Sequence, residues 1–211
     1  MPEKMSAHVS SSPTAIVSKN ILNIPWWRDL SPAVSAELVL SPLEALPLEH
    51  FDVIVIGAGV AGLSAALSAS QQGGSVLVLE QAERIGYGAT GRNAGILSAG
   101  INMSLADLPG NSAEAAFWPA TTELLHSLVQ EATRPGSLLK ACLTGALSLA
   151  ESASAARRLA REARARIALG LNAEIWTPAQ VARATGGRLA TQSVVSALWL
   201  ADEGRIQPLT L

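Results

Sequence analysis

Three glycines near residue 60 have the spacing of a turn that binds phosphate. Gly57, Gly59 and Gly62 follow the apolar run 51–56 and precede a segment rich in alanine and serine. The first glycine permits a tight turn, the second removes the Cβ that would keep a phosphate from the backbone, and the third lets a helix pack closely on a strand. The phosphate would lie at a helix N-terminus, where free N–H groups favour negative charge.

A carboxylate stands where a ribose would be recognised. Glu80 ends a second apolar run, 75–79, and comes 18 positions after Gly62. A carboxylate in this place can accept hydrogen bonds from both ribose hydroxyls and would repel a 2′-phosphate, which argues against NADP. The alternative is an unrelated glycine turn, but the flanking strands and the acid favour a unit that binds the ADP half of a dinucleotide.

The elements that position these residues follow from the same pattern. We expect a βαβ unit, with strands over 51–56 and 75–79 joined by a helix from Val60 to Gln72 that ends at a glycine pair. The small side chains of this helix allow it to pack close to the sheet. The sequence therefore supplies a scaffold for the turn as well as the turn itself.

The segment before this unit is irregular. Residues 1–20 are expected to form a serine-rich arm, and prolines over 21–50 prevent a long helix there. Trp26 and Trp27 are interpreted as anchors that hold this leader against a surface; the alternative is a poorly ordered leader.

The later sequence predicts mostly helices. We expect a helix over 112–132 that is broken at Pro119, a strongly helical stretch over 145–169, and a helix that begins at Thr177. Short strands are expected over 173–176 and 194–200. The arginines of the second helix are interpreted as a solvated face: Arg157, Arg158, Arg161, Arg164 and Arg166.

Composition limits the class of protein. The 211 residues are 49% hydrophobic and carry a net charge of -2, so a sizeable core can form and no global attraction to nucleic acid is expected. The apolar runs are shorter than the ~20 residues of a membrane span, so we expect a cytoplasmic protein without one. The single cysteine, Cys142, allows no intramolecular disulfide and fits a reducing compartment.

The loop after Glu80 bears on the choice between NAD and FAD. Residues 81–96 are rich in glycine, hydroxyl and amide groups. Such a loop can bring N–H groups and a cation against a second phosphate and a flat ring, whereas an NAD-binding unit normally continues into another strand and helix. The loop favours FAD and leaves an NAD-dependent dehydrogenase as a weaker interpretation.

The run Gly88-Ala-Thr-Gly-Arg-Asn-Ala-Gly95 resembles the flavin loop of D-amino-acid-oxidase-type FAD enzymes, in particular the branch of glycine oxidase, sarcosine oxidase and γ-glutamylputrescine oxidase. The aromatic leader and the run Asp202-Glu-Gly-Arg-Ile-Gln-Pro208 are similar to that branch as well. Thr90 stands where serine is commoner, which keeps the hydroxyl. The resemblance is specific to the superfamily and does not define a substrate.

The resemblance implies which residues would hold FAD. The pyrophosphate and ribose contacts fall on the glycine turn and the second strand, a cation approaches the diphosphate, and the loop reaches the ribityl chain and the isoalloxazine ring. In that order the residues are Gly57, Gly59, Val60, Ala61, Gly62, Glu80, Gln81, Arg84, Ala89, Thr90, Arg92, Asn93, Ala94, Gly95 and Ile96. For Arg84, a plain surface arginine is the open alternative.

The same resemblance implies an α/β fold. Residues 1–50 would be a leader, 51–105 a Rossmann-like FAD-binding βαβ domain with its flavin loop, and 106–211 a helical segment with the beginning of an α+β substrate domain that is incomplete. Its implied activity is oxidation of a small amine or amino acid, with hydride transfer from the C–N carbon to flavin N5 and an imine product.

Two classes of function remain open. The chain is expected to be the N-terminal half of an FAD-dependent amine or amino-acid oxidoreductase, or a non-catalytic, truncated or split FAD-binding module that needs a partner chain. No catalytic acid or base and no metal-ligand spacing stands out. His126, in a leucine-rich helix, is interpreted as structural, His50 as a surface residue and Cys142 as a small core residue.

Overall fold

A computed structural model describes residues 7–9, 24–42, 50–110 and 112–211. Within it, the chain divides into two compact units. The first comprises residues 1–94 and 207–211, and the second comprises residues 95–206. Most of the expected serine-rich arm over 1–20 lies outside the described residues. The domain division predicted from the sequence stays a prediction.

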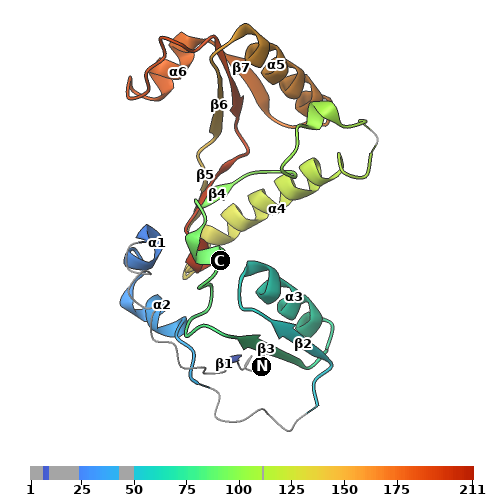
Figure 1. Ribbon diagram of the computed structural model, residues 1–211, viewed down its shortest axis with the longest axis vertical. Coiled ribbons are helices and arrows are strands. Elements are labelled where there is room, and N and C mark those ends of the chain that lie inside the picture. The colour runs from blue at the N-terminus through green and yellow to red at the C-terminus, as the bar shows by residue number, and fades with distance from the viewer. Residues whose placement is uncertain (1–6, 10–23, 43–49, 111) are drawn as a thin grey trace. The chain divides into compact units, whose positions relative to one another are not determined.

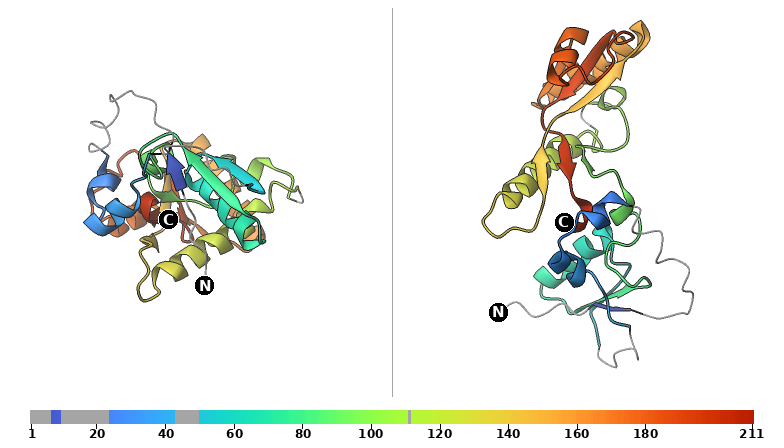
Figure 2. Two further views of the ribbon diagram at one scale, coloured as in Figure 1. Left: turned by 90° about the horizontal axis from the view of Figure 1, so that it is seen from below. Right: turned by 90° about the vertical axis from the view of Figure 1, so that its left-hand side faces the viewer.

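The first unit is built on a three-stranded parallel sheet with the strand order β1-β3-β2. A helix, α3, joins β2 to β3 and lies alongside them (Figures 1 and 2). The elements of the first unit are β1 (Ala7–Val9), α1 (Pro25–Arg28), α2 (Pro32–Glu37), β2 (Val53–Ile56), α3 (Val60–Gln71), β3 (Val76–Glu80) and the 3-10 helices η2 (Thr90–Arg92) and η4 (Pro208–Thr210).

The second unit contains two antiparallel sheets of three strands, in the orders β4-β9-β5 and β6-β8-β7. Helix α5 lies against the second sheet (Figure 1). The elements are β4 (Ile96–Leu97), η3 (Leu105–Asp107), α4 (Phe117–Ala132), β5 (Ala141–Leu143), β6 (Ala146–Ala150), α5 (Ala153–Ala168), β7 (Ala173–Trp176), α6 (Pro178–Ala184), β8 (Ser196–Leu200) and β9 (Gly204–Ile206).

The predicted α/β fold class is confirmed, and the βαβ unit lies where the sequence predicted it. The strands begin one or two residues later than expected, and α3 ends at Gln71. The small residues of α3 do pack closely: Ala66 is fully buried in one core cluster with Ala58 and Val78. None of the helices in the described part of the chain is long and apolar enough to cross a membrane.

The leader forms two short helices, each of which begins at a proline. Pro25 opens α1 and Pro32 opens α2. Proline has no N–H to lose at the start of a helix, so the prolines that prevent a long helix also define where the short ones start. Trp27 is buried in a cluster with Leu209, so one of the two expected tryptophan anchors is a core residue of the first unit.

Two helix predictions in the second unit were wrong in detail. Helix α4 begins at Phe117, and Pro119 falls in its first turn, where an absent N–H breaks no helical hydrogen bond. The stretch expected as one helix over 145–169 divides into β6 and α5, with Ser152 accepting the N–H of Ala155 as N-cap. Pairing with β8 overrides the helical propensity of alanine and leucine in β6.

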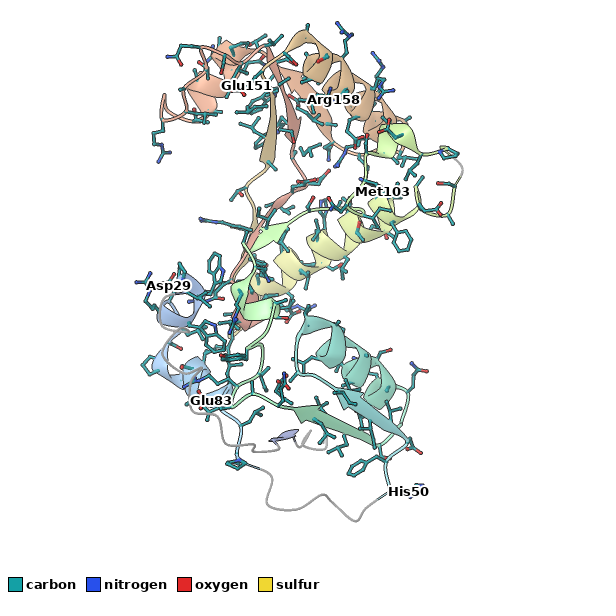
Figure 3. All side chains as sticks on the ribbon, viewed as in Figure 1. Asp29, His50, Glu83, Met103, Glu151 and Arg158 are labelled. Atoms are coloured by element: carbon teal, nitrogen blue, oxygen red, sulfur yellow. The ribbon has the colours of Figure 1, made fainter. Side chains whose placement is uncertain are left out.

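The arginine-rich face of α5 is not uniformly solvated. Arg158 is exposed on α5 (Figure 3), whereas the Arg166 side chain is only 12% exposed and contacts two carboxylates. Its Nε donates to Glu162 Oε1 at 2.8 Å and its Nη1 donates to Glu203 Oε1 at 3.2 Å. The prediction of a solvated face is therefore wrong for Arg166.

Arg166, Glu162 and Glu203 form a charged cluster, and Glu162 links this cluster to η3. The hydroxyl of Ser104 and the N–H of Ala106 both donate to Glu162 Oε2, at 2.8 and 3.0 Å. Burial raises the pKa of Glu162, but the hydrogen bonds from Arg166, Ala106 and Ser104 and the charge of Arg166 together lower that pKa below its usual value. The carboxylate is thus held ionised, and one buried guanidinium serves two buried carboxylates.

Replacing Arg166 by Met should lower the free energy of unfolding by about 3–5 kcal/mol, because two buried carboxylates lose their cation. Arg158→Met, an exposed change on the same helix, should alter it by less than about 0.5 kcal/mol. Urea unfolding followed by circular dichroism measures both. Equal effects of the two substitutions would show that the cluster does not stabilise the second unit.

Candidate functional site

The glycine turn joins β2 to α3 in the conformation that its residue types require. Gly57 has φ +101°, a backbone conformation that residues with a side chain rarely adopt. Its N–H donates to the carbonyl of Leu79 at 2.7 Å. Gly59 is the N-cap residue of α3, with extended backbone. The turn therefore leaves β2 and presents the first N–H groups of α3, as the sequence predicted.

Gly62 lies where α3 passes closest to the turn. A Cβ added to Gly62 would lie 2.0 Å from the carbonyl oxygen of Gly57 and 3.2 Å from the Val55 side chain. Such a contact is far inside van der Waals distance and involves backbone that cannot move without moving the turn. Glycine at this position is therefore required for helix and turn to pack together.

Glu80 at the end of β3 bonds directly to the turn. Its Oε2 accepts the N–H of Ala58 at 2.7 Å, and its Oε1 accepts the N–H of Ala82 at 2.9 Å. The sequence predicts a role for Glu80 at the ribose but does not predict these two hydrogen bonds. Each carboxylate oxygen has two acceptor sites, so both retain capacity for a ribose hydroxyl.

The loop after β3 returns to the start of α3. The hydroxyl oxygen of Thr90 accepts the N–H of Val60 at 2.9 Å and lies 3.1 Å from the position that a Cβ of Gly59 would take. The side-chain amide of Asn93 donates to the carbonyl of Thr90 at 2.6 Å. The structure thus brings Thr90 and Asn93 to the glycine turn, although 30 positions separate Thr90 from Val60.

The other predicted site residues have different surroundings. Arg84 Nη1 lies 3.4 Å from both the carbonyl and the hydroxyl oxygen of Ser35 in the leader, and its guanidinium lies over the Trp27 ring. The guanidinium of Arg92 lies 4.6 Å from the centroid of the Tyr87 ring. The role of Arg84 at a diphosphate stays a prediction.

The remaining predicted contacts differ in exposure and in the unit to which they belong. Gln81, Ala89 and Ala94 are exposed in the first unit. Gly95 and Ile96 belong to the second unit, where Ile96 begins β4 and is 67% exposed. The structure therefore brings together the glycine turn, Glu80, Thr90 and Asn93 within one unit.

Residues that the sequence analysis did not predict complete the site. The carbonyl of Ala58 accepts the N–H of Gly86 at 2.9 Å, and the indole N–H of Trp26 donates to the carbonyl of Asn93 at 2.7 Å. The side-chain amide of Gln207 donates to the carbonyl of Trp26 at 2.7 Å. The sequence singled out the tryptophan pair, the loop 81–96 and the run 202–208, but it did not predict these contacts among them.

The remaining chemical candidates lie apart from the turn in the chain. His126 Nε2 lies 2.9 Å from Asp202 Oδ1 in the second unit, and His50 is exposed before β2 (Figure 3). Cys142 is half-buried on β5, with Arg205 Nε 3.4 Å from its Sγ, and is not the core residue expected. In the described residues no group of three His, Cys, Asp or Glu side chains could hold a metal ion.

The sequence of residues 52–211 matches the family described as DAO, FAD dependent oxidoreductase. The chain belongs to this FAD-dependent oxidoreductase family. The resemblance found in the flavin loop is thereby confirmed, as is FAD as the cofactor of the family. The match begins one residue before β2 and includes the glycine turn, Glu80 and Thr90.

Two curated proteins match shorter segments of the chain. A probable oxidoreductase, OrdL, of Haemophilus influenzae is 58% identical over 48 residues, which are 23% of this chain and 11% of that protein. The mitochondrial L-2-hydroxyglutarate dehydrogenase of Arabidopsis thaliana is 38% identical over 88 residues, 42% of this chain and 17% of that protein.

A solved structure shows the same fold over a larger part of the chain. The L-proline dehydrogenase of P. horikoshii superposes with a TM-score of 0.61 and 23% identity, covering 78% of this chain and 40% of that one. The chain thus spans less than half the length of each of these three proteins.

The geometry of the turn fits the cofactor of this FAD-dependent family. A Cβ at Gly57 would meet nothing within 4 Å among the described residues, so the backbone is open on that side. The first-turn N–H groups of Ala61 and Gly62 have no carbonyl partner within their own helix, as at every α-helix start. These groups suit a diphosphate, and Glu80 suits the ribose beside it.

Gly62→Ala should lower the free energy of unfolding by at least about 2 kcal/mol, because its Cβ would collide with the Gly57 carbonyl. In an ordinary helix the same change would stabilise by about 0.5–1 kcal/mol, so the sign alone is informative. Gly88→Ala is the control, since a Cβ there meets nothing within 4 Å among the described residues. Urea unfolding compares them; a stabilising Gly62→Ala would disprove the close approach.

Proposed function

We propose that the protein oxidises the C–N bond of a small amine or amino acid with FAD. The use of FAD is supported by one observation: Glu80 and Thr90 both accept hydrogen bonds from backbone N–H groups of the glycine turn and the start of α3. The substrate class is supported by the resemblance of the flavin loop and by the fold shared with an L-proline dehydrogenase.

FAD, when bound, would supply a two-electron acceptor for a hydride from the carbon next to the substrate nitrogen. The nitrogen loses a proton, and the resulting imine takes up water to give a carbonyl compound and a free amine or ammonia. This chain would hold FAD with the first N–H groups of α3 at the diphosphate, the Glu80 carboxylate at the ribose and the Thr90 loop at the ribityl chain. The predicted residues of the first unit, from Gly57 to Ala94, are retained as this proposed site, and the roles of Gly95 and Ile96 stay predictions.

A second candidate is a non-catalytic FAD-binding module that pairs with another chain. The exposure of β2 favours it: Ile54 is 58% and Ile56 87% exposed. Ile54 and Ile56 are two positions apart and so lie on the same face of the sheet, which apolar side chains of a partner could cover. Within the described residues β2 pairs with β3 alone, so a partner strand could also pair with its other edge. A further strand of a longer version of this protein would serve the same purpose.

The first experiment is the visible absorption spectrum of the purified chain, followed by anaerobic addition of substrates. We expect flavin bands near stoichiometry with protein and bleaching by an amine or amino acid. 2-Hydroxy acids are tested in parallel, because one relative is named for L-2-hydroxyglutarate. Bleaching by hydroxy acids alone would contradict C–N oxidation, and bound flavin that no substrate reduces would favour the module.

Glu80→Gln should weaken FAD binding by about ten-fold or more, because an amide has one acceptor oxygen where the carboxylate has two, and it carries no charge. Either the N–H of Ala58 or that of Ala82 would also lose its partner. Glu83→Gln, an exposed carboxylate in the loop after β3 (Figure 3), is the matched control. Quenching of FAD fluorescence measures both affinities, and equal affinities would remove Glu80 from the proposed site.

A further inference from the structure

The leader belongs to the first unit, and its described residues 24–42 contact the loop after β3 at several points. Backbone hydrogen bonds join Leu40 N–H to the Glu83 carbonyl and Ile85 N–H to the Leu38 carbonyl, both at 2.9 Å. These bonds flank an antiparallel bridge between Val39 and Arg84. The leader therefore pairs with the start of the loop as a strand would.

The two tryptophans hold the far end of the same loop in different ways. Trp27 is buried, and its ring lies 3.0 Å from where a Cβ of Gly91 would be, so it contributes by packing. Trp26 contributes a hydrogen bond: its indole N–H donates to the carbonyl of Asn93 at 2.7 Å. The Trp27 indole N–H is buried with no partner among the described residues.

Three hydrogen bonds connect Trp26 to the start of α3. Trp26 donates to the Asn93 carbonyl, the Asn93 side-chain amide donates to the Thr90 carbonyl, and the Thr90 hydroxyl accepts the N–H of Val60. The backbone carbonyl of Trp26 is itself fixed by the side-chain amide of Gln207, which is 8% exposed. Each bond lies between 2.6 and 2.9 Å.

We propose that Trp26 is a positioning residue for FAD. Trp26 acts through Asn93 and Thr90 to fix the loop against the glycine turn. The inference rests on the proposed function, because the turn is taken as the diphosphate site. Trp26 lies in the leader, before the first residue of the family match, and 67 positions separate it from Asn93. Preorganising a loop in this way raises affinity by reducing the ordering cost of binding.

The adjacent tryptophans offer a matched test. Trp26→Phe and Trp27→Phe remove the same atoms, but only the first removes a hydrogen bond to the loop. We expect Trp26→Phe to weaken FAD binding by about three- to ten-fold, the value of one such bond. Trp27→Phe should change FAD affinity less, although its ring is the more buried and its loss costs more packing.

A double-mutant cycle tests the connection to Thr90. Thr90→Val removes the hydroxyl that accepts the Val60 N–H. If Trp26 acts through this hydroxyl, Trp26→Phe should weaken FAD binding much less in the Thr90→Val chain than in the unmodified chain. If the losses of FAD affinity in the two single variants simply add in the double variant, Trp26 does not act through Thr90.

Hydrogen–deuterium exchange of the chain without FAD separates this proposal from the proposed function. Trp26→Phe should speed exchange in residues 85–95 and at the start of α3 more than Trp27→Phe does. An unmodified chain that binds no FAD would overturn the proposed function, and the exchange data would still decide whether Trp26 fixes the loop. Equal exchange in both variants, or FAD affinity unchanged by Trp26→Phe, would overturn the proposal.

Discussion

The hydrogen bond from Ala58 N–H to Glu80 is the contact on which the first unit depends. It joins the end of β3 to the middle of the glycine turn at 2.7 Å, so the turn and the acid have one fixed relation. Ala58 is fully buried, and an unpaired N–H there would cost the full desolvation of a donor. The Glu80 carboxylate therefore stabilises the fold of the turn whether or not a ligand is bound.

The βαβ unit around this contact was predictable from sequence because its turn restricts residue type. The turn needs glycine at Gly57 because φ is +101°, and at Gly62 because a Cβ would collide with backbone. Such constraints act on residue type at fixed positions, so they leave a pattern that can be recognised. The helix at Thr177 was predictable for the same reason, since its capping box is local in sequence.

The second unit shows where sequence patterns fail. Residues 146–150 have good helical propensity, but five paired positions with β8 make them a strand. Arg166 looks like its solvated neighbours on α5 until Glu203, 37 positions later, is brought beside it. The bonds of Glu80 to Ala58 and of Trp26 to Asn93 are likewise absent from any local pattern. In each case the deciding partner is distant in sequence and fixed by tertiary packing.

The leader and residues 207–211 show how distant segments can share one task. Neither belongs to the glycine turn or its loop, yet Gln207 holds the Trp26 carbonyl while its own oxygen accepts the N–H of Leu209. Leu209 in turn packs with Trp27, beside the loop glycines. A loop rich in glycine has a high conformational entropy when free, so it needs partners outside itself to keep one shape. Trp27 supplies one such contact by packing its ring against the loop, and Trp26 supplies another by donating its indole N–H to the Asn93 carbonyl.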